Sequence, residues 1–302
     1  MKKKRSESLL FFAPYMICFA LFWLVPLAYG LYMSLCKFSL TKGNGGFVGL
    51  ESYIKIFTPG SMYFESFFRG LKQSLLFVVG SVPLLVLVAL ALALIVDNLP
   101  ARCRTFFRTI YFMSYAISVT AVAAIFKWLF NSNGGYINNI LLRLGILQEP
   151  VHWLEDQPFA WIVLILATVW WTVGYNMMLF INALNGIDPA LHEAAEVDGA
   201  NFWQRLRAIT LPSIRSVTSY VTLTSIIASF NMYGQSALIT KGGPLNSTST
   251  LIQEISNTIF NNNNLGVGNA MAIMMGIIVM LMAMAQQYLQ REKAEISEVN
   301  GK

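Results

Sequence analysis

Two long apolar stretches of the chain contain hydroxyl and amide side chains at helical spacing. In the stretch 159–183, Thr168, Thr172 and Asn176 form one row along a helix, and the stretch 216–239 is denser in such groups. The polar and aromatic side chains of both stretches that are candidates for a ligand pathway are Thr168, Trp171, Thr172, Asn176, Ser225, Ser229, Asn231 and Tyr233. Hydroxyls and amides pair with the hydroxyls of a sugar, and aromatic rings pack on the apolar face of its ring. These residues could therefore line a path for an uncharged ligand, or they could form hydrogen bonds that only hold neighbouring helices together.

Catalytic, metal-dependent and nucleotide-dependent chemistry is disfavoured by the residue types. The two histidines, His152 and His192, have no second His or Cys at ligand spacing, so we expect no metal site. No Ser-His-Asp or Cys-His arrangement is placed for catalysis, and the three cysteines fit neither a disulfide framework nor a zinc site. The pattern Gly-x4-Gly-Lys-Ser/Thr does not occur, so we expect this chain to bind no ATP or other cofactor and not to be an enzyme.

The segment 185–212, between these two stretches, predicts two short helices joined by a bend. Asp188 and Pro189 suit the N-cap and first position of a helix, which Gly199 is placed to end in a left-handed conformation. Asn201 can cap a second helix, whose apolar residues recur on one face. Such a helix pair suits docking in a groove of another protein, although an amphipathic helix lying on a membrane would show a similar pattern.

The composition indicates a membrane protein. Of 302 residues, 56% are hydrophobic and only 12% are charged, which is more apolar surface than a soluble core of this size can bury. The basic residues, at a net charge of +6, form no continuous stripe, so nucleic-acid binding is disfavoured. Stretches long and apolar enough to cross a membrane as helices occur at residues 9–35, 73–96, 109–130, 159–183, 216–239 and 267–288.

The distribution of Lys and Arg predicts that both termini are cytoplasmic. Basic residues at 2–5 precede an apolar stretch that is too long for a signal peptide, so we expect a retained membrane helix. Most other basic residues then fall on the inner side, with the outer loop at 36–72 as an exception. We predict a cytoplasmic N-terminus at 1–8, a six-helix membrane domain at 9–290 and a cytoplasmic tail at 291–302.

The segment 185–212 resembles the EAA loop of the permease subunits of ABC importers. The resemblance lies in Glu-Ala-Ala at 193–195, a glycine at 199 and Ile-x-Leu-Pro at 209–212, in an inner loop between the expected spans. We call this segment the coupling loop. The resemblance implies that the residues coupling the chain to an ATPase are Glu193, Ala194, Ala195, Asp198, Gly199, Ile209, Leu211 and Pro212.

Two further segments resemble the carbohydrate-uptake branch of the same family. Residues 131–145 resemble its outer segment after the third span, and residues 240–250 resemble its Thr-Gly-Gly-Gly-Pro segment, with Lys241 in place of a glycine. Met113 and Ser114 stand where members often have Leu-Pro, a departure that leaves open the local helix geometry at the start of the third span but not the assignment to the family. The resemblance covers nearly the whole chain.

The resemblance implies an all-α membrane fold of six transmembrane helices, with the cytoplasmic coupling loop between the fourth and fifth. It also implies a sugar pathway along those two spans. The partners would be a second permease subunit, which we expect to be a different chain, a cytoplasmic ATPase dimer that binds ATP and magnesium, and an extracytoplasmic solute-binding protein. The location would be the cell membrane of a prokaryote.

Two alternatives to a sugar importer are compatible with the sequence. An importer of glycerol phosphate or another polyol would use the same type of permease, and a phosphate would favour Lys or Arg near the path, for which Lys127 and Lys241 are the candidates. A stand-alone secondary transporter would often have an intramembrane acidic residue or arginine for ion coupling, and the expected spans have almost no charge.

Overall fold

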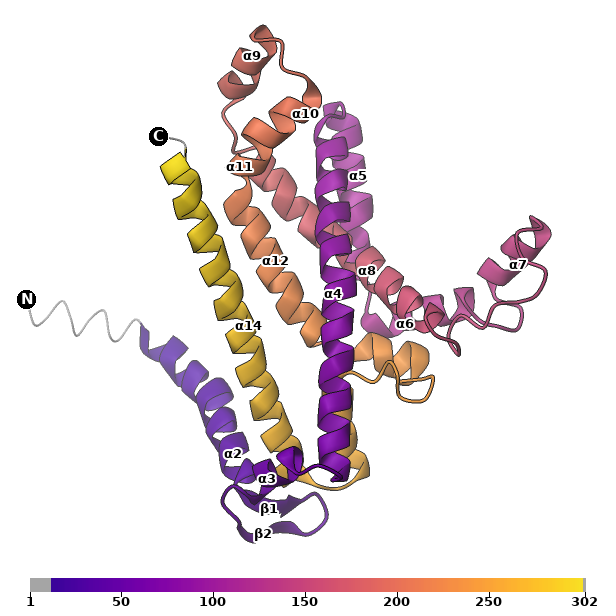
Figure 1. Ribbon diagram of the computed structural model, residues 1–302, viewed down its shortest axis with the longest axis vertical. Helices are drawn as coiled ribbons and strands as arrows, with labels where there is room; N and C mark the ends of the chain where they lie inside the picture. Colours follow the sequence, from indigo (N-terminus) through magenta and orange to yellow (C-terminus); the bar gives the residue numbers. More distant parts are fainter. Residues whose placement is uncertain (1–11, 301–302) are drawn as a thin grey trace, which may run out of the picture. The chain divides into compact units, whose positions relative to one another are not determined.

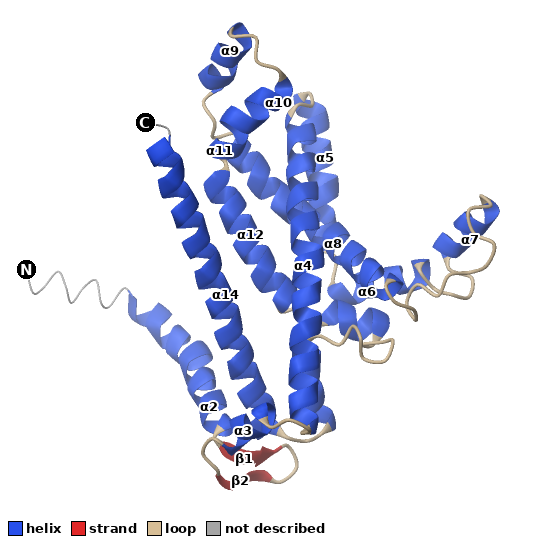
Figure 2. Ribbon diagram, in the orientation of Figure 1, coloured by secondary structure: helices blue, strands red, loops and turns tan. Residues whose placement is uncertain are grey.

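The computed structural model describes residues 12–300, with side-chain environments up to Tyr288. The predicted cytoplasmic N-terminus at 1–8 lies outside the described residues, as do residues 301 and 302 of the predicted tail. The described part is mostly helical, which confirms the predicted helical membrane class (Figure 2). It also contains a small two-stranded sheet, which is not among the predicted elements.

The chain divides into two compact units, which we describe separately. One contains the residues up to Arg69 together with Glu254–Ile278, and the other contains Gly70–Gln253 and the residues from Val279 onward. After a helical segment at 12–19, the elements that begin in the first unit are η1 (Ala20–Leu24), α2 (Val25–Ser34), β1 (Cys36–Ser39), β2 (Gly43–Phe47), α3 (Glu51–Phe57), α4 (Met62–Asp97), η5 (Asn257–Asn261) and α14 (Leu265–Asn300) (Figure 1). The elements that begin in the second unit are α5 (Ala101–Met113), η2 (Ser114–Ala116), α6 (Val119–Leu129), α7 (Tyr136–Arg143), α8 (Phe159–Leu184), α9 (Pro189–Val197), α10 (Phe202–Arg205), η3 (Leu206–Thr210), α11 (Leu211–Ser213), α12 (Arg215–Phe230), η4 (Ser236–Thr240) and α13 (Leu251–Ser256).

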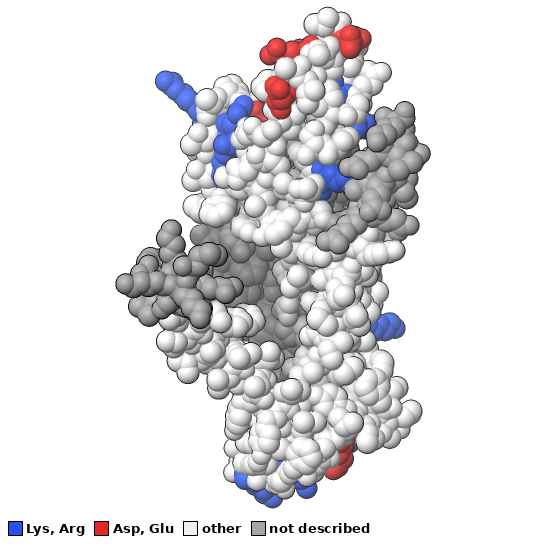
Figure 3. Space-filling model, turned by 90° about the vertical axis from the view of Figure 1, so that its left-hand side faces the viewer, with Lys and Arg blue, Asp and Glu red and all other residues white. Residues whose placement is uncertain are grey.

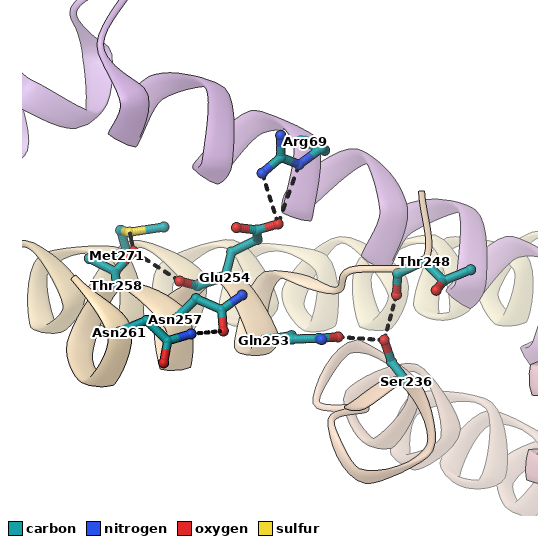
Figure 4. Close-up of polar contacts among 9 residues, drawn as sticks. All are labelled: Arg69, Ser236, Thr248, Gln253, Glu254, Asn257, Thr258, Asn261 and Met271. Carbon is teal, nitrogen blue, oxygen red and sulfur yellow. Dashed lines mark hydrogen bonds and ion pairs between the residues drawn. The ribbon is translucent and has the colours of Figure 1, made fainter. Parts of the chain in front are cut away.

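The first unit is held together by contacts between residues far apart in the sequence. The strands β1 and β2 form an antiparallel hairpin, and the side-chain oxygen of Asn263 accepts a hydrogen bond from the backbone N–H of Leu40 in its turn (2.8 Å). Arg69 of α4 donates to Glu254 at 3.0 Å, as Figure 4 shows. Because Glu254 is buried, removing Arg69 would leave a buried carboxylate without its ion-pair partner.

Among the described residues, four helices are long and apolar enough to cross a membrane. They are Phe12–Ser34, Met62–Asp97, Phe159–Leu184 and Leu265–Tyr288. These helices match the predicted first, second, fourth and sixth spans within the described residues. A fifth crossing is formed if the bent pair α5 and α6 is counted as one span.

The prediction of a continuous third span at 109–130 was wrong. Helix α5 runs into the 3-10 turn η2 and the helical path breaks at residues 117 and 118, where it bends by 97° into α6. The hydroxyl of Ser118 accepts a hydrogen bond from the N–H of Ala121, so it caps α6, and the hydroxyl of Ser114 donates to the carbonyl of Tyr111. These side chains replace backbone partners that an unbroken helix would supply, which apolar periodicity alone does not reveal.

The prediction of a continuous fifth span at 216–239 was also wrong. Helix α12 ends at Phe230, residues 231–233 leave the helix, and a π-helical turn, η4, follows. The 16 residues of α12 would extend about 24 Å, which is less than the roughly 30 Å of a bilayer core. The predicted total of six crossings stays a prediction.

Helix α8 is the central element of the second unit. On one side it packs with residues of α4 and α12, including Ala89, Phe180 and Val221. On another it packs with residues of α6 and η4, including Val122, Leu164 and Ile239. Helix α5 also approaches α8 closely, because a Cβ on Gly174 would lie 1.9 Å from the backbone oxygen of Tyr111.

We therefore expect Gly174→Ala to force α5 and α8 apart and to destabilise the protein by about 1–3 kcal/mol, the usual cost of overpacking. The melting temperature of the purified protein should fall by about 5 °C. The matched control is Gly276→Ala in α14, where an added Cβ meets nothing within 4 Å. Equal melting temperatures for the two variants would contradict this account of the α5–α8 contact.

Candidate functional site

A cavity of about 450 Å³ lies in the second unit, between α8, α12 and the breaks that follow α5 and α12. The structure brings together at this cavity all the predicted pathway residues: Thr168, Trp171, Thr172, Asn176, Ser225, Ser229, Asn231 and Tyr233. Helical spacing places the first four on one face of α8 and Ser225 and Ser229 on one face of α12. Their assignment as substrate contacts stays a prediction.

Buried hydrogen bonds join the helices on the polar side of the cavity. The amide of Asn176 donates to the hydroxyl of Ser225 (3.3 Å). The hydroxyl of Ser81 in α4 donates to that of Ser229 (3.1 Å). The same side chains therefore both hold the helices together and line the cavity, so the two interpretations of the sequence pattern are compatible.

Three aromatic rings form another part of the cavity lining. The rings of Tyr115 and Tyr175 stack with centroids 5.1 Å apart, and Trp171 lies 6.4 Å from Tyr115. Tyr115 is not among the residues predicted for the site, because residues 109–130 were expected to form one continuous helix. The one signal in the sequence is the departure from Leu-Pro at Met113 and Ser114, because the helix breaks a few residues later, at residues 117 and 118.

The cavity lies where the two interrupted helices meet. Val119 begins α6, and Gly234 begins the helical turns after the second break. A Cβ on Gly234 would lie 2.7 Å from Val119 Cγ2, so only glycine allows the two segments to approach this closely. A change in either break would therefore alter the shape of the cavity.

The described residues that line this cavity are all uncharged. Lys127 and Lys241, the two cations that the sequence offered for a phosphate, do not line it. The available chemistry is hydrogen bonding by hydroxyls and amides and packing by aromatic rings, which suits an uncharged, hydroxyl-rich ligand.

The coupling loop has the predicted two-helix form at its beginning. A carboxylate oxygen of Asp188 accepts a hydrogen bond from the N–H of Ala190 (3.0 Å) and caps α9. Gly199 has a φ of 76°, the left-handed conformation predicted for it. Its N–H donates to the carbonyl of Glu196 (3.0 Å), and the N–H of Ala200 donates to that of Ala195 (2.9 Å), which together form a Schellman motif.

The second half of the coupling loop is less regular than predicted. Asn201 and Gln204 form a reciprocal capping box at the start of α10. The chain then widens into the π-helical turn η3, in which the N–H of Leu211 donates to the carbonyl of Leu206. Pro212, which has no N–H to donate, lies in the three-residue helix α11, and α12 begins at Arg215. Glu196 and Arg205 form an ion pair that links α9 to α10.

A cleft of about 510 Å³ lies beside the coupling loop, and it is lined by Glu193, Glu196 and Arg205 together with Asp97 from the end of α4. Glu193 is the one predicted coupling residue among the described residues of this lining. Of the other predicted coupling residues, those that are exposed are Ala194, Asp198, Gly199, Leu211 and Pro212, and those that are half-buried are Ala195 and Ile209. Figure 3 shows acidic side chains gathered at the end of this unit that contains α9 and α10.

Comparison with known proteins places this chain in a family. Residues 56–294 match the family described as "Binding-protein-dependent transport system inner membrane component". The lactose transport system permease protein LacF of Rhizobium radiobacter is 31% identical, with 94% of each chain covered. The sn-glycerol-3-phosphate transport system permease protein UgpA of Agrobacterium fabrum is 29% identical, with 91% of each chain covered.

Solved structures share the fold. A chain of a bacterial ABC transporter for import of the acidic polysaccharide alginate matches with a TM-score of 0.81 and 22% identity, over 96% of this chain and 98% of that chain. The same type of transporter, in complex with a periplasmic protein that holds an alginate pentasaccharide, matches with a TM-score of 0.82 and 21% identity, over 96% of each chain. At this identity the likeness shows the fold alone.

The capping box makes a local prediction for the coupling loop. Asn201→Ala should cost about 1 kcal/mol in the stability of α10, because the first N–H groups lose a capping acceptor. Hydrogen–deuterium exchange of residues 202–206 should then speed up about fivefold. Asn201→Asp keeps an acceptor and is the matched control, so equal exchange in both variants would argue against a stabilising cap.

Proposed function

The chain belongs to the family of binding-protein-dependent transport system inner membrane components, and on this premise we propose that it is the permease subunit of an ATP-driven sugar importer. Its role is to form the membrane pathway for a sugar that an extracytoplasmic solute-binding protein delivers. The observation that carries the proposal is the cavity of about 450 Å³, which combines hydroxyls, amides and aromatic rings without a charged side chain among the described residues that line it.

The cavity favours an uncharged sugar over a phosphorylated substrate. Relatives of this chain are named for lactose, for arabino-oligosaccharides and for glycerol 3-phosphate, so relationship alone leaves both classes open. Phosphate groups are usually recognised by Arg or Lys, which bring a matching charge and several donors. None of the described residues that line the cavity is an Arg or Lys, whereas its aromatic rings match the apolar face of a sugar ring.

We assign ATP hydrolysis to separate cytoplasmic subunits that bind ATP and magnesium. The coupling loop suits docking to such a subunit because it offers exposed apolar side chains, Val197 and Trp203 among them, next to acidic ones. Glu193 is both exposed and part of the cleft beside the loop, so it can reach a basic group of a partner. The second permease subunit would be a different chain, and this topology would place both termini in the cytoplasm.

Transport then follows from a rigid-body motion. The closing of the ATPase dimer would displace the coupling loop, and the ion pair between Glu196 and Arg205 would help α9 and α10 to move together. Because α12 follows directly after the loop, this motion would reach the broken segment at 231–233 and change access to the cavity. ATP drives the switch only through its different affinity for the two states.

A detergent pull-down of the tagged chain from its own cells tests the role of the coupling loop. The wild-type protein should copurify an ATPase, identified by mass spectrometry, and Glu193→Lys should retain at least tenfold less of it, because the charge at the docking contact is reversed. Glu193→Lys combined with Gly199→Pro should lose it fully, since proline cannot adopt the φ of 76° found here.

The control for that pull-down is Glu149→Lys, the same charge reversal at an exposed position in the loop after α7. It should copurify as much ATPase as the wild-type protein. Retention of the ATPase by the double variant would refute the coupling role. Absence of any ATPase from the wild-type sample, under conditions that preserve a control complex, would favour a stand-alone transporter.

Uptake measurements test the cavity. Tyr115→Ala combined with Tyr175→Ala should lower uptake about tenfold, because two ring-packing contacts of about 0.5–1.5 kcal/mol each are lost. The probe is the radiolabelled form of the sugar that elutes from the solute-binding protein, which we expect in the same pull-down. Tyr220→Ala, an exposed tyrosine of α12 outside the cavity, is the matched control. Undiminished uptake by the double variant, with the ATPase still bound, would remove the cavity from the pathway.

A further inference from the structure

Helix α7 is a short helix that a short linker joins to the end of α6. Six residues, 130–135, separate Leu129 from Tyr136, and at about 3.5 Å per residue they span at most about 21 Å. Figure 1 shows α7 in a segment that extends away from α6 and α8 within the second unit. Its eight residues are far too few to cross a membrane, so its apolar residues need another explanation.

The rotation of α7 about its own axis is set by one buried amide. Asn138 is 2% exposed, and its nitrogen donates to the carbonyl of Val151 (3.0 Å). Its oxygen accepts from the N–H of Val151 (3.2 Å) and from the indole of Trp153 (2.8 Å). Ile137, next to Asn138, packs against the buried cluster that includes Phe126. The face of α7 that remains exposed is therefore a fixed property of the fold.

One edge of that exposed face is apolar along its length. Tyr136, Ile140 and Leu144 follow one another at intervals of four residues, and Leu144 is 67% exposed. The ring of Trp128 in α6, itself 62% exposed, stacks on that of Tyr136 with centroids 6.0 Å apart. Trp128, Tyr136, Ile140 and Leu144 form what we call the α7 stripe. Soluble surfaces seldom leave an ordered stripe of this kind uncovered.

The chemistry of the stripe matches the interface of a lipid bilayer. Trp and Tyr concentrate at the level of lipid headgroups, where their rings are apolar and their N–H and O–H groups reach water. Asn139 and Arg143 are exposed beside the stripe, so the helix has a polar edge that can stay in the headgroup layer. The stripe is also continuous with the exposed side of α6, where Ile125 precedes Trp128 by one turn.

We propose that α7 lies in the outer interface of the membrane, with the α7 stripe inserted among the lipids, and that it anchors the outer end of α6. The eleven residues of α6 extend only about 16 Å, so this helix cannot cross the bilayer by itself. Its first residue, Val119, contacts the second helix break at the cavity. An anchored α7 therefore fixes the outer end of a helix that forms part of the cavity lining.

Depth measurements by spin labelling test the anchor. The intact complex, purified with its copurifying subunits, is placed in nanodiscs of phosphatidylethanolamine and phosphatidylglycerol, with exposed Cys18 and Cys103 changed to serine. Nitroxides on Ile140→Cys and Leu144→Cys should be at least threefold more accessible to oxygen than to a water-soluble nickel complex. A nitroxide on Asn139→Cys, on the polar edge of the same helix, should show the reverse preference.

Either of two results would overturn the proposal. Labels on the α7 stripe that are as accessible to nickel as the Asn139 label would place the stripe in water. Immobilised labels shielded from both reagents would show that another protein subunit covers it.

A second measurement separates anchoring from a purely internal role. Ile140→Asp combined with Leu144→Asp should lower the melting temperature in nanodiscs but much less in detergent, relative to Asn139→Asp. Equal losses in both media would mean that these side chains stabilise the protein internally and do not anchor it in lipid.

Discussion

Every backbone N–H and C=O inside a bilayer needs a partner within the protein, because hydrocarbon offers none. This constraint decides where helices in this chain can break. At the first break the carbonyl of Ile117 accepts a hydrogen bond from the indole of Trp171 (2.9 Å). At the second, the hydroxyl of Thr250 donates to the carbonyl of Met232 (2.7 Å). Side chains distant in sequence therefore make both breaks tolerable, and the cavity lies where the two breaks meet.

The cavity and the coupling loop are stabilised in different ways. The cavity lining is held by contacts between helices, such as Asn176 with Ser225 and the close approach of α5 at Gly174. The coupling loop is held mainly by caps and turns between near neighbours, so its shape depends little on contacts with the rest of the unit. A compact loop joined directly to a broken helix is the arrangement that the proposed transmission of motion to the cavity would need.

Much of the candidate site could be predicted from the sequence because its residues occupy regular helices. Thr168, Thr172 and Asn176 share a face of α8, and a helical period is enough to place them together. Tyr115 could not be found in this way, because it reaches the cavity through the break after α5. The hairpin of β1 and β2 was missed for a related reason: its turn is held by Asn263, 223 residues beyond Leu40.

The sequence by itself determined the membrane class, the helical regions, the ends of α9 and the motif on which the prediction of a coupling loop rests. These features depend on composition, on helical spacing and on contacts between near neighbours, all of which can be seen in a linear chain. Only the tertiary structure decided where the third and fifth stretches break, which rings line the cavity and which face of α7 stays exposed. Those features depend on hydrogen bonds and close approaches between distant residues, and such pairings exist only when the chain is folded.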